Sequence, residues 1–160
     1  MKKNILVILL LSAIVSLSSC GGGHSAEYVN DIIVEKADKV TDLMIKVSDY
    51  IDDDKYSNAQ AYLDSVANYV VESKPIIAAL NNKSAEKMKQ ATLEYLELFK
   101  EGVTDYRQAI ELYQTAQDNE QMEKANDLIN NFLEKTGKKI TEIQEFQVAF
   151  AKENNIILLK

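Results

Sequence analysis

The sequence predicts an all-α fold, an antiparallel up-down four-helix bundle over residues 27–160. From Glu27 onward, apolar residues recur at alternating steps of three and four, which places them on one face of a helix. Four such segments follow one another with short connections, and short connections favour antiparallel neighbours. Strand signals are absent, so a single helical domain is expected.

The first helix is expected to follow Ser25, whose hydroxyl can cap the helix N-terminus. Its inner face would consist of Val29, Ile33, Ala37, Val40, Met44, Val47 and Ile51. Asp52, Asp53 and Asp54 then interrupt the pattern. This acidic stretch predicts the first connection.

The second helix has a capping-box signature in Ser57 and Gln60. Its inner face would hold Ala59, Tyr62, Leu63, Val66, Tyr69, Val70 and Ser73. Pro75 lacks a backbone N–H and crowds the preceding turn, so we expect a kink or break near it, with the helix ending or bending near Ser73. Residues 76–80 would then form a short helical or irregular corner.

The third helix should begin near Ser84, and Asp118 can cap the fourth. The expected inner residues of the third are Met88, Thr92, Tyr95, Phe99, Gly102, Tyr106, Ala109, Tyr113 and Ala116. Those of the fourth are Met122, Ala125, Ile129, Phe132, Thr136, Ile140, Ile143, Phe146 and Phe150. A glycine inside a helix costs about 1 kcal/mol relative to alanine, so Gly102 suggests close helix packing, with Gly137 at a similar level.

The C-terminal residues 156–159 form an apolar segment after Asn154 and Asn155, which favour the end of a helix. One interpretation is that this segment folds back over the open end of the core. The alternative is that it docks a partner.

The N-terminus combines Lys2 and Lys3, an apolar run over residues 5–15, and the sequence Leu17-Ser18-Ser19-Cys20. A membrane-spanning helix needs about 20 apolar residues, and this run is shorter. These features resemble the export signal and lipobox of a bacterial lipoprotein precursor. The resemblance implies cleavage before Cys20 and acylation of that cysteine.

By this resemblance, residues 1–19 are a signal peptide and residues 20–26 a flexible lipidated tether. Gly21 stands where Gram-negative sorting rules would place Asp for retention in the inner membrane, which favours the outer membrane within the cell envelope. The order of elements in the remaining chain is similar to that of small all-helical Gram-negative envelope lipoproteins of unknown function.

The charge of the chain is acidic, with a formal net value of −7. Removal of residues 1–19 would take away Lys2 and Lys3 and no acid, giving −9. Such a surface repels nucleic acid, so no nucleic-acid partner is expected.

Few residues could carry catalysis. His24 and Cys20 are the sole histidine and cysteine. His24 lies in the predicted tether and Cys20 is the predicted lipidation site, which excludes a His-dependent catalytic triad, and the Glu-x-x-His pairs of di-iron bundles are missing. Asp49 and residues 52–54 do not fit a calcium-binding loop, because Gly and Glu are missing at the required positions. We therefore expect no enzyme activity, no cofactor and no metal.

Two functional hypotheses remain. The first is a lipid-anchored, non-enzymatic interaction module that binds another envelope or extracellular protein. The second is a carrier or sensor of a small apolar ligand held between helices. A candidate ligand or partner groove is formed by five tyrosines, Tyr62, Tyr69, Tyr95, Tyr106 and Tyr113, whose alternative role is packing of the core.

Overall fold

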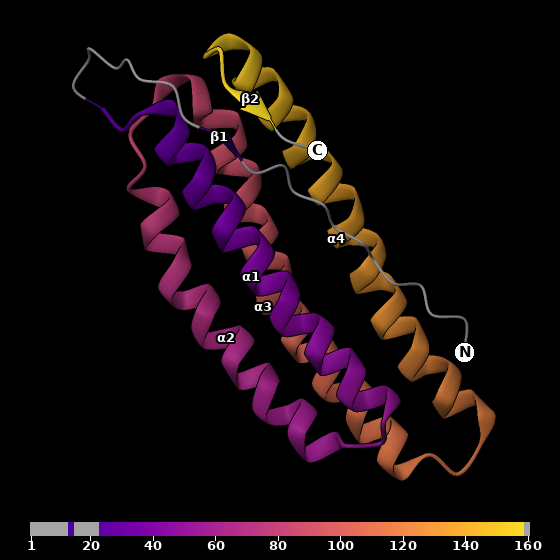
Figure 1. Cartoon of the computed structure of the whole chain (residues 1–160). Helices are drawn as coiled ribbons and strands as arrows, with labels where there is room; N and C mark the ends of the chain where they lie inside the picture. Colours follow the sequence, from indigo (N-terminus) through magenta and orange to yellow (C-terminus); the bar gives the residue numbers. More distant parts are fainter. Residues whose placement is uncertain (1–12, 15–22, 159–160) are drawn as a thin grey trace.

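A computed structural model describes residues 13–14 and 23–158, and there the predicted all-α bundle is confirmed (Figure 1). The helices are α1 (Ala26–Asp52), α2 (Tyr56–Ala78), α3 (Glu86–Thr115) and α4 (Asn119–Glu153). A 3-10 turn, η1 (Lys83–Ala85), leads into α3. Short connections make successive helices antiparallel (Figure 1). Within the described ranges, none of the helices has an apolar stretch sufficient to cross a membrane.

Helix α1 follows its sequence pattern closely. All seven predicted inner residues are buried, and the Ser25 hydroxyl accepts a hydrogen bond from the backbone N–H of Tyr28 at 3.2 Å. The helix ends where Asp54 adopts the left-handed conformation, with φ 59°. The backbone N–H of Lys55 then donates to the carbonyl of Tyr50 at 2.8 Å, which closes the helix C-terminus.

The N-terminus of α2 differs from its prediction. The helix begins at Tyr56, and its cap residue, Lys55, makes no side-chain cap hydrogen bond. The capping box expected from Ser57 and Gln60 is therefore wrong. The physical reason is the tight turn at Asp54, which starts the helix before Ser57 could take the cap position.

The expected break near Pro75 does not occur, since α2 continues through Pro75 to Ala78. Pro75 cannot donate to the carbonyl of Val71, four residues earlier. The side chain of Val71 is 66% exposed, so this carbonyl lies on the solvent side and water can satisfy it. Ser73, where the helix was expected to end or bend, is a buried residue within it.

The last two helices begin as predicted. Asn82 caps η1 by accepting from the N–H of Ser84, and Asp118 caps α4 by accepting from the N–H of Gln121 at 2.9 Å. Most predicted inner residues are buried, but Met122 is 40% exposed. Gln147, rather than Phe146, is fully buried near the end of α4, so the inner face is one residue out of register there.

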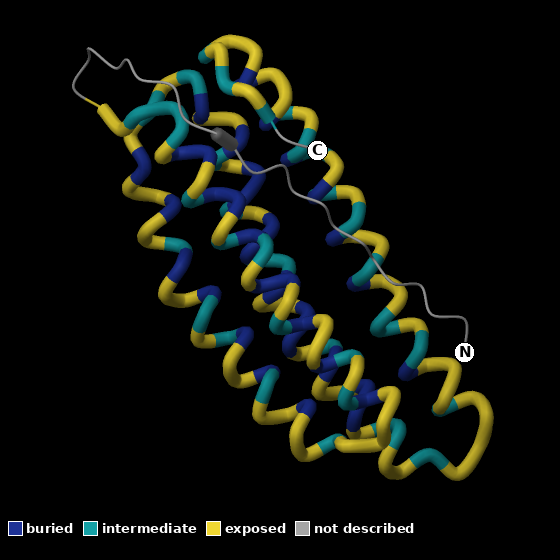
Figure 2. Tube along the Cα trace, viewed as in Figure 1, coloured by how far each residue is buried: buried dark blue, intermediate teal, exposed yellow. Residues whose placement is uncertain are grey.

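The helices pack in chain order, α1 on α2, α2 on α3 and α3 on α4, and α3 also lies against α1. Buried residues form a stripe along each helix that faces its neighbours, while the opposite faces are exposed (Figure 2). Between α1 and α4, the amide of Gln147 donates to the side-chain oxygen of Asn30 at 2.9 Å. This buried polar pair joins the first helix to the last.

A short pairing of strands was not expected from the sequence. β1 (Ala13–Ile14) pairs antiparallel with β2 (Ile157–Leu158), with Ala13 opposite Leu158 and Ile14 opposite Ile157. Ile156 packs against the core, whereas the side chain of Ile157 is 68% exposed. The apolar C-terminal segment therefore covers the core only in part.

Candidate functional site

Two of the five candidate tyrosines lie in the core. Tyr95 and Tyr106 project from α3 and are fully buried. Their hydroxyls form hydrogen bonds with the hydroxyls of Thr41 at 2.8 Å and Ser48 at 3.2 Å on α1. Burial raises the pKa of both phenols, that of Tyr106 to about 12. They are therefore neutral hydrogen-bonding core residues at physiological pH.

Two others, Tyr62 and Tyr69, cover the side of the core between α1 and α2. Both are half-buried. The ammonium of Lys46 lies 5.6 Å from the ring centre of Tyr62, and that of Lys36 lies 5.7 Å from the ring centre of Tyr69. The ring of Tyr50 is 5.3 Å from that of Tyr62. These rings are thus held by cation-π and aromatic contacts within the chain.

The fifth candidate, Tyr113, lies near the C-terminal end of α3. Its hydroxyl donates to the side-chain oxygen of Asn126 on α4 at 2.8 Å. Its ring stacks on Tyr56, with the ring centres 6.4 Å apart. The structure therefore distributes the five tyrosines over three places and does not bring them together in one groove.

The interior between α3 and α4 is filled by aromatic rings. The ring of Phe132 packs edge-on against Phe99 and Tyr106, at centroid distances of 5.2 and 5.4 Å. Gly102 lies directly under this ring, because a Cβ added to Gly102 would come within 2.3 Å of a Phe132 ring carbon. The close packing expected at Gly102 is confirmed, with Phe132 rather than Gly137 as the neighbour.

Gln90 and Glu94 are exposed on α3, and we call these two residues the α3 ridge. A surface hollow lies on each side of the ridge. The hollow between α2 and α3 has a volume of about 530 Å³, and that between α3 and α4 about 410 Å³. The α3 ridge belongs to both. The first hollow also contains Lys74, Pro75, Ala78, Leu93 and Glu97, and the second Glu86, Lys87, Ala91, Glu142 and Phe146. Each hollow therefore combines apolar side chains with charged ones.

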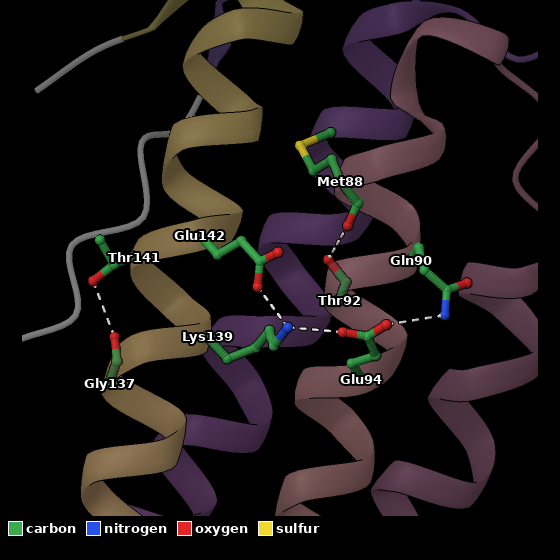
Figure 3. Close-up of polar contacts among 8 residues, drawn as sticks. All are labelled: Met88, Gln90, Thr92, Glu94, Gly137, Lys139, Thr141 and Glu142. Carbon is green, nitrogen blue, oxygen red and sulfur yellow. Dashed lines mark hydrogen bonds and ion pairs between the residues drawn. The ribbon is translucent and has the colours of Figure 1, made fainter.

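The charges beside the α3 ridge are paired across helices. Lys139 of α4 donates to Glu94 of α3 at 2.7 Å and to Glu142 of its own helix at 2.5 Å, and Gln90 also donates to Glu94 (Figure 3). The hydrogen bond from Lys139 lowers the pKa of the Glu94 carboxyl. On the other side, Lys74 of α2 pairs with Glu97. Glu94 therefore stays ionised while its position is fixed by Lys139 and Gln90.

The predicted lipidation site, Cys20, lies outside the described residues. The structure does describe the end of the predicted tether. The N–H of His24 donates to the carbonyl of Asn81 at 2.9 Å, and the N–H of Asn81 donates to His24 Nδ1 at 3.0 Å. A Cβ on Gly23 would lie 2.6 Å from the same carbonyl. The tether predicted over residues 20–26 is thus fixed to the bundle from Gly23 onward.

The described part of the chain contains no group of three His, Cys, Asp or Glu side chains that could hold a metal ion. The acids that follow α1 interact locally. Asp53 pairs with Lys55 at 2.9 Å, and Asp54 accepts from the hydroxyl of Tyr56 at 2.9 Å. These contacts give the acidic connection a role in ending α1 and starting α2.

Comparison with protein-family models, curated proteins and solved structures finds no match to this chain. The function must therefore be argued from the geometry and the sequence. The α3 ridge combines two hollows with charges paired across helices, and the proposal below is argued from it.

Sequence reasoning missed the α3 ridge and the buried pair of Asn30 and Gln147. The pair had a detectable signal, because Gln147 continues the alternating steps through Ile140, Ile143 and Phe150. The ridge had none. Its hollows depend on how α2 and α4 sit beside α3, and the pattern within α3 does not contain that information.

Proposed function

We propose that this chain is a lipid-anchored protein of the cell envelope, attached through acylated Cys20 and more suited to the outer than the inner membrane. The lipobox, the short apolar run before it and the glycines after it support this proposal. Two or three acyl chains would hold the protein stably, whereas one would do so only marginally.

We further propose that the helical domain is a non-enzymatic module that binds another envelope or extracellular protein at the α3 ridge. The observation that carries this proposal is the pair of hollows on either side of Gln90 and Glu94. Both are open to solvent and contain apolar side chains, Leu93 and Pro75 in one and Ala91 and Phe146 in the other. A partner could place one apolar side chain in each hollow.

The carboxylates on and beside the α3 ridge, although each is paired with a lysine, offer acceptor oxygens to donor groups of a partner. Glu94 is exposed, its pKa is lowered, and Glu86, Glu97 and Glu142 lie around it. A carboxylate that is already oriented can accept hydrogen bonds from Arg or Lys of a partner with little further ordering. The ligand-carrier alternative has less support, because aromatic rings fill the interior around Gly102.

Site-specific photo-crosslinking in intact cells tests the interaction module. A photoreactive residue at Gln90 should give a reproducible adduct with one partner protein. The matched control is Ser65, which is exposed on α2 and does not line either hollow. The same adduct at both positions, or no adduct at Gln90 in repeated experiments, would count against the α3 ridge as the binding surface.

A further inference from the structure

The beginning of the domain and its C-terminal segment meet at one end of the bundle. Asn82 donates to the carbonyl of His24 at 3.2 Å, which continues the pairing of His24 with Asn81. Ser84 donates to the side chain of Asn82 at 2.8 Å, and Asn154 donates to Ser84 at 3.1 Å. This series of hydrogen bonds joins the start of α1, the α2–α3 connection and the end of α4 (Figure 1).

The chain leaves α4 at this end in a defined direction. Asn155 is left-handed, with φ 55°, and the N–H of Ile156 donates to the carbonyl of Ala151 at 2.8 Å. This arrangement ends the helix and turns the chain back, so that Ile156 packs against the core. Ile157, at 68% exposure, then projects its apolar side chain away from the core. The turn therefore leaves the apolar side chain of Ile157 on the surface at this end of the bundle.

The proposed processing removes the present neighbour of this segment. Residues 157 and 158 pair with Ala13 and Ile14, which belong to the predicted signal peptide. Cys20 would remain, three residues before Gly23, and three residues of chain can span no more than about 11 Å. The bilayer that holds the acyl chains is thus the surface that comes nearest to this end of the bundle.

The charge of the two ends agrees with this orientation. The end near Gly23, residues 23–27, 79–86 and 153–158, carries one lysine and three glutamates. The connections at the far end, residues 52–55 and 116–120, carry five acids and one lysine. An anionic membrane surface would repel the far end more strongly. The end that holds the apolar segment is the one with the smaller excess of acids.

We propose that, in the processed protein, the C-terminal segment at Ile157 and Leu158 rests in the membrane interface as a second contact beside the lipid anchor. This inference rests on the proposed acylation of Cys20. The segment contributes apolar side chains at the depth of the headgroups and does not span the bilayer. Two contacts at one end fix the orientation of the bundle, which a single flexible attachment would leave free.

The test uses the full chain, processed in cells, with an environment-sensitive fluorophore on a cysteine introduced by Ile157→Cys. The matched control is Ser57→Cys, an exposed position at the far end of the bundle. Each protein is placed in vesicles of phosphatidylethanolamine and phosphatidylglycerol, with and without brominated acyl chains. Brominated lipid should lower the emission of the probe at position 157 by about twofold or more and leave that at position 57 unchanged.

Mass analysis of the N-terminal peptide, carried out on the same samples, reports acylation of Cys20 separately. Acylated protein whose probe at position 157 is unquenched would overturn the membrane contact and leave the proposed anchor intact. Protein without acyl chains would overturn the proposed anchor, and the membrane contact with it. Equal quenching at positions 157 and 57 would also contradict the inference, because it would show no preferred orientation.

Discussion

Gly102 shows at the scale of one residue how closely the interior is packed. The ring of Phe132 occupies the space that a side chain at position 102 would need, and Phe99 and Tyr106 hold that ring from two sides. Alanine would gain about 1 kcal/mol in helix propensity at this position. The loss of packing should exceed this gain, because the ring has little room to move.

Gly102→Ala is therefore expected to lower the free energy of unfolding by about 1 to 3 kcal/mol, the usual cost of overpacking. Urea unfolding followed by circular dichroism measures this change. In a Phe132→Leu background the same substitution should cost less, since the ring atoms it meets are absent. Equal costs in the two backgrounds would contradict the contact.

Asp38 makes stability depend on pH. Burial, with a smaller contribution from Asp42, raises the pKa of the Asp38 carboxyl to about 6. The folded protein therefore binds this proton more tightly than the unfolded chain does. The contribution of Asp38 to stability is greatest below about pH 4 and declines as pH rises through about 6.

Asp38→Asn should remove this decline and stabilise the protein at pH 7 by about 1 kcal/mol, a value reduced for the partial exposure of the carboxyl. Urea unfolding at pH 4 and pH 7 measures both effects. An unchanged difference between the two pH values in the Asn variant would exclude Asp38 as its source.

At the scale of the element, sequence patterns were most informative where local interactions decide the structure. The caps at Ser25 and Asp118 and the buried face of α1 were predicted correctly, because each depends on residues within a few positions. The end of α2 was not predicted correctly, since the helix continues through Pro75. A proline normally disfavours a helix interior, but the solvent position of the Val71 carbonyl, which tertiary packing decides, made Pro75 tolerable here.

The turn between α1 and α2 offers a test of helix termination. Asp54 holds a left-handed conformation that glycine adopts at no steric cost. Asp54→Gly should stabilise the protein by about 1 kcal/mol, less the small contribution of its exposed hydrogen bond with Tyr56. Asp53→Gly is the control, since Asp53 has φ −90° and gains nothing from the change.

Thermal unfolding of the two variants measures this difference. A higher midpoint for Asp54→Gly than for Asp53→Gly is the expected order. The reverse order would mean that the side chain of Asp54 matters more to the turn than its backbone conformation does.

At the scale of the whole molecule, the sequence allowed prediction of the four helices but not of the surface they form. The five tyrosines do not form the predicted groove because Tyr95 and Tyr106 lie on the inner stripe of α3, whereas Tyr113 of α3 and Tyr62 and Tyr69 of α2 lie at the edges of the inner stripes of their helices. Periodicity places all five on similar faces. It does not determine how far each face turns toward a neighbouring helix, and that rotation separates the buried tyrosines from the half-buried ones.

Cys20→Ala tests the proposed attachment of the molecule as a whole. The variant should lose acylation and should either accumulate as unprocessed precursor or release the domain from the membrane. Metabolic labelling with a fatty acid and fractionation of the cells measure these outcomes. Undiminished labelling of the Ala variant would exclude Cys20 as the acylated residue, because no other cysteine is present.

Under the proposed anchoring at Cys20, the pairing of His24 with Asn81 would limit how far the domain reaches from the membrane. A long flexible linker would let a domain sample a large volume, whereas the short stretch from Cys20 to Gly23 would leave almost none. Under the proposed anchoring, reach is then set by the rigid bundle, which the 27 residues of α1 extend to about 40 Å. Gln90 and Glu94 lie in the first three turns of α3, at the anchored end, so a partner of the α3 ridge would be bound close to the membrane and the far end of the bundle would project away from it.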